Sequence, residues 1–362
     1  MLELMLLASA LFLAFGNGAN DNFKGFATVW GSETLTYRNA LVLATAATVL
    51  GSLASLLFAG TLVQEFSGKG LVAQEVLRDP HFILSVAAGA AVTILLATRL
   101  GFPVSTTHAL IGALIGAGLS HGVDAVHFPK LVQTFLAPLL VSPLVAMVLA
   151  ASSARLLKRR SPADDCACLV EGTLDLEIAA DGTVASRFSA PEILVASDVA
   201  CESMATPVRV SLSRSLDRVH ILSAAAICFA RGVNDTPKLA ALMIAGQMLA
   251  IQHATIMVAV VMAVGGLLFA RGVAETMSQR VTSLDHGQGI AANLVTAVLV
   301  LFASKLGMPV STTHVSVGSI IGVGASAHTL HWGVVRNVLL SWVVTLPLAA
   351  GVAYGVIAVM AG

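Results

Sequence analysis

Long apolar stretches separated by short polar segments make up most of this chain of 362 residues. Apolar runs cover residues 2–15, 39–63, 82–98 and 131–154, and a second series begins near Val219. A helix of about 20 apolar residues is long enough to cross the hydrocarbon core of a bilayer. The pattern therefore predicts an all-α polytopic membrane protein with about 10–12 membrane segments, some of them shorter than a full span.

The composition supports this interpretation and excludes other classes. Hydrophobic residues make up 57% of the chain and charged residues 11%, and the mean hydropathy is +0.88. Soluble domains carry about 25% charged residues, so a soluble core does not explain these values. The formal net charge is zero, so no basic surface argues for nucleic acid as a partner. We therefore expect a multi-pass protein of the cell (inner) membrane that contacts membrane lipid and binds no nucleic acid.

Residues 155–217 differ from the rest of the chain because they are rich in charge. They open with a basic cluster and continue with mainly acidic residues. Asp181-Gly182 is a hairpin turn signal within a partly alternating sequence. Basic residues close to the end of a span favour the cytoplasmic side. We predict a small cytoplasmic insert with some strand, or a partly disordered linker, between membrane repeats at 1–154 and 218–362.

Two motifs recur in both halves and indicate an internal duplication. Gly-Phe-Pro-Val-Ser-Thr-Thr-His at 101–108 returns as Gly-Met-Pro-Val-Ser-Thr-Thr-His at 307–314, at an offset of 206 residues. Gly-Ala-Asn-Asp at 18–21 returns as Gly-Val-Asn-Asp at 232–235, at an offset of 214 residues. Blocks that recur in one order are not expected from chance resemblance of apolar sequence. Lys24 and Lys238 follow the Asn-Asp motifs at equal spacing, and Glu65 and Glu275 follow a third repeated block, Leu-Leu-Phe-Ala at 56–59 and 267–270, at nearly equal spacing.

The Pro-Val-Ser-Thr-Thr-His stretch predicts the start of a helix in each half. Proline cannot continue a helix from before but is pre-set to begin one, and the hydroxyls of Ser and Thr can cap it. A helix N-terminus carries unpaired N–H donors and the positive end of the helix dipole, which favours an anion. At membrane depth such a start is tolerated only where it lines a cavity or is buried. We expect re-entrant segments leading into 109–118 and 315–324, with both starts facing one anion.

The Asn-Asp motifs interrupt apolar sequence at 16–25 and again at 230–238. Such an interruption usually marks a discontinuous helix at a transport site, and charged side chains at membrane depth are costly unless they serve a function. The alternative is an ordinary loop between two spans. Because the same polar group breaks an apolar run twice, we favour the functional interpretation.

These motifs resemble the duplicated signature of the inorganic phosphate transporter (PiT) family, and the resemblance covers both hydrophobic halves. It implies an inverted repeat with broken helices and paired re-entrant hairpins. It implies a secondary active symporter that holds inorganic phosphate at the repeat interface. The implied phosphate ligands are Ser105, Thr106, Thr107, Ser311, Thr312 and Thr313. The implied coupling-cation and gating residues are Asn20, Asp21, Asn234 and Asp235.

Coupling to Na⁺ or H⁺ follows from charge, and no other cofactor is expected. A phosphate anion near Asp21 and Asp235 would be repelled unless a cation intervenes, and oxygen ligands suit a hard cation such as Na⁺. The two carboxylates are therefore the expected metal ligands if the protein is sodium-coupled. Family members commonly carry small, Ala-rich sequence after Asn-Asp, whereas this chain carries Lys24 and Lys238, whose ammonium groups could occupy part of the field of a sodium ion. The lysines attract the anion or pair with the neighbouring Asp in one interpretation, and snorkel to the interface in the other.

Further charged and titratable residues have weaker assignments. Glu65 and Glu275 pair with basic residues at the interface between the halves or gate it. His108 and His314 relay protons near neutral pH or, as we favour, pack and hydrogen-bond in the first turns of their helices. Arg231 has no basic counterpart in the first half and is interpreted as structural.

Other functions remain open at this stage. Sulfate or another tetrahedral oxyanion would suit a hydroxyl-lined site, although an acceptor such as a carboxylate favours phosphate, which can donate a hydrogen bond. A membrane oxyanion sensor with 155–217 as its output module is a second alternative, and a homodimer is a further possible assembly. An enzyme is not expected, because the sequence contains no His-Glu-x-x-His, Gly-x-Ser-x-Gly or P-loop motif.

Overall fold

The chain divides into two compact units in the computed structural model. The membrane unit comprises residues 1–157 and 221–362, and the insert unit comprises residues 158–220. Both hydrophobic halves therefore form one body. The residues that the structure describes are 2–58, 60–77, 79–156, 166–170, 174–178, 184–188, 190–203 and 208–361.

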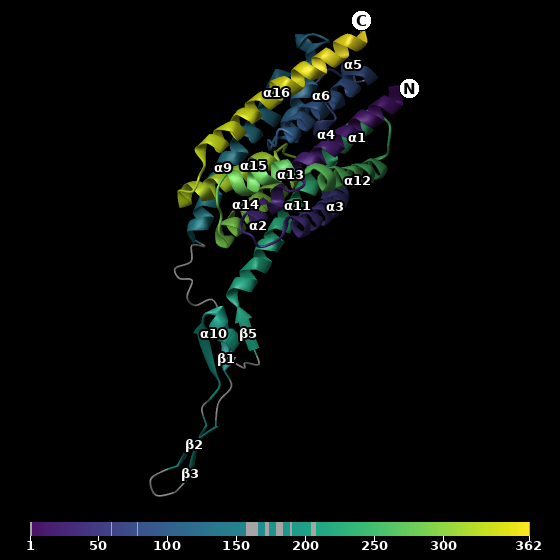
Figure 1. Cartoon of the computed structure of the whole chain (residues 1–362). Helices are drawn as coiled ribbons and strands as arrows, with labels where there is room; N and C mark the ends of the chain where they lie inside the picture. The colour runs from purple at the N-terminus through teal and green to yellow at the C-terminus, as the bar shows by residue number, and fades with distance from the viewer. Residues whose placement is uncertain are drawn as a thin grey trace. The chain divides into compact units, whose positions relative to one another are not determined.

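The first half of the membrane unit is helical and ends in a long helix, α9 (Figure 1). It contains α1 (Leu2–Asp21), the 3₁₀ turn η1 (Lys24–Phe26), α2 (Ala27–Gly31), α3 (Tyr37–Phe58), α4 (Gly60–Phe66), α5 (Gln74–Leu77), α6 (Pro80–Arg99), α7 (Thr106–Leu119), the 3₁₀ turn η2 (Val123–Ala125), α8 (Phe128–Lys130), the π-helical turn η3 (Leu131–Leu136) and α9 (Ala137–Leu156).

The second half repeats this order with fewer short elements. It contains α11 (Leu212–Ala245), α12 (Ile251–Phe269), α13 (Arg271–Glu275), the π-helical turn η4 (Thr276–Arg280), α14 (His286–Lys305), α15 (Thr312–Ala327) and α16 (Trp332–Ala361). Each of the longer helices of the first half has a counterpart here, with α7 matching α15 and α9 matching α16. The duplication in the sequence is thus also a duplication of elements.

Seven helical segments within the described residues are long and apolar enough to cross a membrane, which agrees with a multi-pass membrane protein. The count is below the expected number because α7 and α15 have only 14 and 16 residues. The apolar part of α11 also carries Arg231, Asp235 and Lys238. The seven segments are Leu2–Gly31, Tyr37–Leu57, Pro80–Arg99, Phe128–Leu156, Ile251–Phe269, His286–Lys305 and Trp332–Met360.

The two Asn-Asp stretches differ in backbone structure. In the first half the helix is broken as predicted, because α1 ends at Asp21 and a 3₁₀ turn follows. In the second half the predicted break is wrong, because α11 runs through 230–238 without interruption. Asp235 lies one turn from both Arg231 and Lys238 and pairs with them, so the charges are compensated along an intact helix. The helix α11 also contains Pro237. Proline inside a membrane helix is tolerated where neighbouring groups satisfy the backbone carbonyl that it leaves without a partner.

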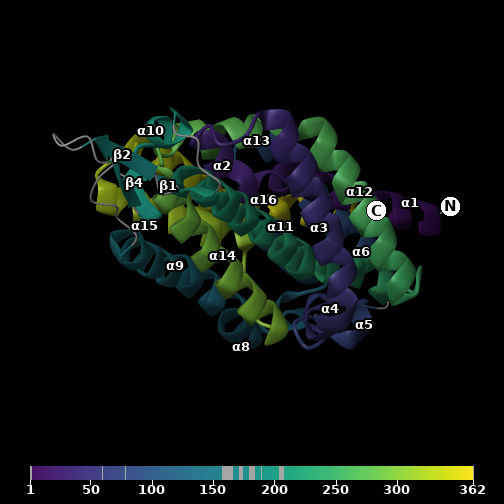
Figure 2. The same ribbon diagram turned by 90° about the horizontal axis from the view of Figure 1, so that it is seen from below.

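The halves pack through two equivalent helix pairs, each with one helix from either half. The short α7 of the first half lies against α16 of the second, and α15 of the second lies against α9 of the first, as Figures 1 and 2 show for α9 and α15. A Cβ atom at Gly116 would lie 2.0 Å from the Ala350 carbonyl oxygen, and one at Gly322 would lie 2.1 Å from the Met147 carbonyl oxygen. Small residues permit such close helix crossings in membranes. Reciprocal contacts of this kind are those of a two-fold arrangement, while its inversion across the membrane stays a prediction.

The insert unit contains strands, which agrees with the first of the two predicted alternatives. A three-stranded antiparallel sheet has the order β4-β1-β5, and β2 and β3 form a separate antiparallel pair. The expected turn at Asp181-Gly182 lies outside the described residues. Cys166, Cys168 and Cys201 are buried together in this unit. Its elements are β1 (Cys166–Val170), β2 (Leu174–Ile178), β3 (Val184–Phe188), β4 (Glu192–Ala196), α10 (Asp198–Ser203) and β5 (Val208–Ser211).

Candidate functional site

Each Ser-Thr-Thr motif begins a short helix, as predicted. The helix α7 starts at Thr106 and α15 at Thr312, directly after a serine in an extended conformation. Ser105 Oγ accepts a hydrogen bond of 3.1 Å from the backbone N–H three residues later, and Ser311 Oγ accepts the equivalent bond of 3.2 Å. Both serines are therefore N-caps with matching geometry.

The two helix starts contact each other across the interface between the halves. Thr313 Oγ1 donates to the Val104 carbonyl oxygen at 2.9 Å, and Thr107 Oγ1 donates to the Val310 carbonyl oxygen at 3.3 Å. Each contact joins a threonine of one half to the residue just before the serine cap of the other half. Two motifs 206 residues apart in the sequence thus meet at one place.

The hydroxyl-bearing residues at this place are closed off from solvent. Since none of them is more than 3% exposed, an anion could reach them only if the halves or the short helices move. These residues are Ser105, Thr106, Thr107, Ser311, Thr312 and Thr313.

The asparagines of the Asn-Asp motifs hold the helix starts. Asn20 Oδ1 accepts a hydrogen bond of 3.1 Å from the backbone N–H of Val104. Asn234 Nδ2 donates to Thr312 Oγ1 at 3.0 Å, and Asn234 Oδ1 accepts from Ser304 Oγ at 3.1 Å. The structure therefore brings the predicted coupling residues and the predicted phosphate ligands into direct contact.

Lys24 points into this contact region and not toward a membrane surface. Its side chain is 2% exposed. Its Nζ donates to Asn20 Oδ1 at 2.9 Å, to the Val104 carbonyl oxygen at 2.9 Å and to Thr313 Oγ1 at 2.6 Å, and it pairs with Asp21 Oδ1. The ammonium group is thus enclosed by four oxygen atoms of four chemical types. We call these four oxygens the Lys24 cage.

Lys238 repeats this arrangement from the other half. Its side chain is fully buried. Its Nζ donates to Thr107 Oγ1 at 3.0 Å and to the Val310 carbonyl oxygen at 2.7 Å, and it lies 3.3 Å from Asp235 Oδ1. We call these three oxygens the Lys238 cage. In each half the lysine contacts its own aspartate and the threonine of the opposite half.

One buried cation has no counterpart in the first half. Arg231 lies at the repeat position of Asn17, since 231 − 17 equals the offset of 214 between the Asn-Asp motifs. Its guanidinium donates to Asn17 Oδ1 at 2.7 Å, and its Nε lies 3.6 Å from Asp235 Oδ2. Asn17 Nδ2 in turn donates to Thr106 Oγ1 at 2.8 Å and to Asp21 Oδ2 at 3.2 Å. The sequence interpretation missed Asn17 and left Arg231 outside the site, although their matched repeat positions were visible.

The buried charges of the site do not cancel. Two carboxylates, Asp21 and Asp235, lie among three cations, Lys24, Lys238 and Arg231, and each of these residues is at most 2% exposed. With all five ionised, three positive charges against two negative charges leave an excess of +1. An uncompensated buried charge is costly. An anion bound among these groups would offset that cost.

The glycine of each Asn-Asp motif is explained by helix crossings. A Cβ atom at Gly18 would lie 2.0 Å from the Met262 carbonyl oxygen of α12, and one at Gly232 would lie 2.3 Å from the Thr48 carbonyl oxygen of α3. Met262 and Thr48 are themselves related by the offset of 214, since 262 − 48 = 214. The motif thus combines a close crossing of helices from opposite halves with polar residues one turn further along.

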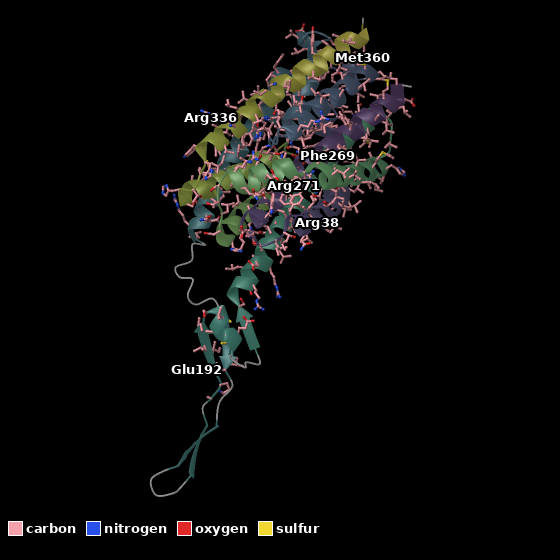
Figure 3. The ribbon with its side chains drawn as sticks, viewed as in Figure 1. Arg38, Glu192, Phe269, Arg271, Arg336 and Met360 are labelled. Carbon is pink, nitrogen blue, oxygen red and sulfur yellow. The ribbon has the colours of Figure 1, made fainter. Side chains whose placement is uncertain are left out.

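The remaining predicted residues, Glu65 and Glu275, contribute no oxygen to the lysine cages and form ion pairs of their own. Glu65 pairs with Lys130 Nζ at 3.2 Å, and Glu275 pairs with Arg271 Nε at 3.0 Å on the short helix α13, where Figure 3 marks the exposed Arg271. Each glutamate thus pairs with a basic residue of its own half, whereas a place at the interface between the halves and a gating role stay predictions.

The two histidines that follow the Ser-Thr-Thr motifs pack against each other. The ring centroids of His108 and His314 are 4.4 Å apart, and the ring of His314 also lies 3.8 Å from that of Trp342. His314 is 2% exposed. The packing agrees with the favoured interpretation, but the hydrogen bonds that it also expected are absent at both buried ring nitrogens of His314.

Comparisons with known proteins agree over nearly the whole chain. A family model described as the phosphate transporter family matches residues 17–353. The chain is 30% identical to a protein named as a candidate phosphate permease of Pyrococcus furiosus, over 95% of this chain and 92% of that protein. It is 26% identical to the chloroplastic inorganic phosphate transporter 2-1 of Arabidopsis thaliana, over 98% of this chain and 71% of that protein. A solved structure titled "The sodium-dependent phosphate transporter" covers 99% of both chains with a TM-score of 0.78 and 22% identity, which shows a shared fold.

Proposed function

Because the chain belongs to the phosphate transporter family, we propose that it is a secondary active transporter that carries inorganic phosphate in symport with Na⁺ or H⁺. We place it in the cell (inner) membrane, in contact with lipid. Its family and its fold are those of transporters, and the proposal assigns it no enzymatic activity. Assembly as a homodimer stays a prediction.

One observation carries the proposal for the binding site: the two Ser-Thr-Thr helix starts meet at a buried point among three cationic side chains. Phosphate at neutral pH is a mono- or dianion, and its transfer into a low-dielectric site needs many donors and compensating charge. Hydroxyl and backbone N–H groups supply donors, and the excess of +1 supplies charge. The proposed ligands are Ser105, Thr106, Thr107, Ser311, Thr312 and Thr313.

The same contacts indicate which hydrogen bonds a bound anion would replace. Thr107 and Thr313 donate their hydroxyl protons to the Val310 and Val104 carbonyl oxygens. A phosphate oxygen that enters between the helix starts would take over these hydroxyl donors. Each hydroxyl bond to the opposite half is then exchanged for one to the anion, so that binding separates the two helix starts.

The carboxylates have a different part in the proposal. Asp21 and Asp235 would repel a phosphate anion unless a positive charge lies between, so the charge state of the cages controls whether the anion is accepted. Asp21→Asn and Asp235→Asn are expected to abolish cation-dependent uptake. If uptake by both variants still depends on the cation gradient that drives the wild type, this part of the proposal is contradicted.

The direct test is uptake of labelled phosphate into proteoliposomes under imposed Na⁺ or proton gradients. The double variant Thr107→Val, Thr313→Val removes one hydroxyl from each half while it keeps the shape of the side chains. A hydrogen bond to a charged group contributes about 1.5–3 kcal/mol, so each lost hydroxyl should weaken uptake at subsaturating phosphate about tenfold or more. Thr255→Val, at a buried threonine of α12 outside the lysine cages, is the matched control and should leave uptake unchanged.

Sulfate as a competitor separates the nearest alternative. If the carboxylates select an anion that can donate a hydrogen bond, a tenfold excess of sulfate should leave phosphate uptake intact. Sites built to hydrogen-bond a substrate group reject analogues that lack that group. Equal competition by sulfate and by unlabelled phosphate would favour a general oxyanion permease. Binding of phosphate without any transport would favour a sensor.

A further inference from the structure

We propose that the ammonium groups of Lys24 and Lys238 are built-in replacements for coupling sodium ions, so that phosphate transport by this chain needs no sodium. The inference rests on the proposed phosphate transport and concerns its coupling. It starts from the two lysine cages, whose oxygens are of the kinds that hard cations take in proteins.

The Lys24 cage has the chemistry of a cation site. An amide oxygen, a carboxylate oxygen, a backbone carbonyl oxygen and a hydroxyl oxygen surround the Nζ atom. They come from α1, from the stretch before α7 and from α15, and thus from both halves. A monovalent metal ion would find the same ligands here if the lysine were shorter, and the ammonium group already supplies the single positive charge that such an ion would bring.

The Lys238 cage supports the same conclusion independently. A hydroxyl, a carboxylate and a backbone carbonyl oxygen surround its Nζ atom. The carbonyl belongs to Val310, the repeat counterpart of Val104, since 310 − 104 equals the offset of 206. Both lysines therefore fill equivalent positions in the two halves. This symmetry is expected if each half once offered one cation position.

The hydrogen-bond capacity of the ammonium groups argues against direct anion ligands. A lysine ammonium has three donors and no acceptor. Lys24 has four oxygen partners and Lys238 has three, so in both cases every donor is engaged with the protein. A phosphate could gain a lysine donor only at the expense of one of these bonds. The hydroxyls of Thr107 and Thr313 can donate to phosphate without breaking an ion pair, because they now donate to neutral backbone carbonyl oxygens.

Sodium cannot share the cages with the lysines. A second positive charge beside a buried ammonium group would be repelled in a low-dielectric environment, and its ligands are already occupied. Arg231 adds a third positive charge near Asp235. The cations of the site are thus tethered to the chain and cannot be carried across the membrane with the substrate.

The experiment measures phosphate uptake by the wild-type chain in sodium medium and in N-methyl-glucamine medium of equal ionic strength. We expect equal uptake in both, whereas sodium coupling of ordinary strength would change the apparent phosphate affinity by about fivefold or more. Uptake that requires sodium would overturn this inference and leave phosphate transport standing. Absence of phosphate uptake in either medium would instead overturn the proposed function.

A double variant tests the cages themselves. Lys24→Ala with Lys238→Ala leaves two sets of oxygens without a cation, so sodium should now raise its thermal unfolding temperature, as any ligand that binds only the folded state does. The wild type should show no such rise when sodium replaces N-methyl-glucamine. Lys305→Ala, at an exposed lysine in the last turn of α14, is the control and should behave like the wild type.

Two results would overturn the assignment of the cages as former cation sites. One is a folded double variant that gains nothing from sodium, and the other is a wild type that sodium stabilises. If the double variant does not fold, the comparison of wild-type unfolding temperatures in the two media still decides the question.

Discussion

The two halves of the membrane unit place the same polar groups on helices of different shape. In the first half, α1 ends at Asp21 and a 3₁₀ turn carries Lys24, whereas Asp235 and Lys238 lie on the uninterrupted α11. Each lysine nevertheless contacts its own aspartate, the carbonyl before its own serine cap and the threonine of the opposite half. Packing between the halves therefore positions the cages, and unwinding of a helix is not required.

The halves also differ at one side chain, and the symmetry explains why. Arg231 and Asn17 occupy equivalent repeat positions and contact each other, with the guanidinium 2.7 Å from Asn17 Oδ1. Equivalent positions meet in this way only close to a two-fold axis. Two arginines there would bring two buried positive charges together, which is costly without further anions. One arginine and one asparagine give a complementary donor and acceptor instead.

The largest expected effect comes from erasing this difference. Arg231→Asn makes the two halves alike at this position and leaves Asp235 with one fewer buried cation. Removing one partner of a buried ion pair costs about 3–5 kcal/mol, so the variant should show a greatly reduced unfolding temperature in detergent micelles and little phosphate uptake.

The matched control for this variant is an arginine in an exposed ion pair. Arg271→Asn breaks the ion pair with Glu275, in which the Arg271 side chain is 74% exposed and the Glu275 side chain 33% exposed. The effect of this substitution on stability should stay within about 1 kcal/mol. If the variant at 231 is no less stable than this control, the guanidinium at the axis does not hold the halves together.

A smaller effect, equal in the two halves, is expected where α7 packs against α16 and α15 packs against α9. Gly116→Ala and Gly322→Ala each place a methyl group about 2 Å from a backbone carbonyl oxygen of the partner helix, and overpacking of this kind costs about 1–3 kcal/mol. Because the two crossings are equivalent, the two variants should lose the same amount of stability in thermal unfolding measurements.

Gly351→Ala on α16 is the control for the crossings, because a Cβ atom there meets nothing within 4 Å. It should be neutral or slightly stabilising, since alanine is favoured over glycine in helices. Unequal losses of stability at positions 116 and 322 would show that one of the two helix pairs packs more closely than the other.

Much of this arrangement was predictable from the sequence because duplication leaves a visible offset. The repeated Pro-Val-Ser-Thr-Thr-His stretch predicted both serine-capped helix starts, and the hydropathy pattern predicted the membrane helices. The charged and partly alternating character of 155–217 predicted an insert with some strand, or a partly disordered linker, and the described residues agree with the first alternative. In each case one local property, a proline start, an apolar run or an alternating pattern, was sufficient to specify the element.

The errors arose where pairing between residues decides the structure. A polar stretch in an apolar run predicts a break at both 16–25 and 230–238, but Arg231 and Lys238 compensate Asp235 within an intact helix in the second case. The enclosure of Lys24 and Lys238 by oxygens of both halves depends on long-range contacts that no local pattern contains. Arg231 seemed structural because its partner, Asn17, is neutral.

The smallest expected effect concerns the two serine caps, which are the features that the halves share most closely. Ser105 and Ser311 have φ and ψ angles within 4° of each other and capping bonds of 3.1 and 3.2 Å. Loss of a serine cap costs about 1 kcal/mol, so Ser105→Ala and Ser311→Ala should lower the stability in thermal unfolding by that amount each and equally. Ser152→Ala, at an exposed serine within α9 that bonds the carbonyl one turn before it, serves as the control and should be close to neutral. A clear loss at only one of the two caps would mean that only one helix start depends on its serine, so that the two halves would not be equivalent even where their backbones coincide.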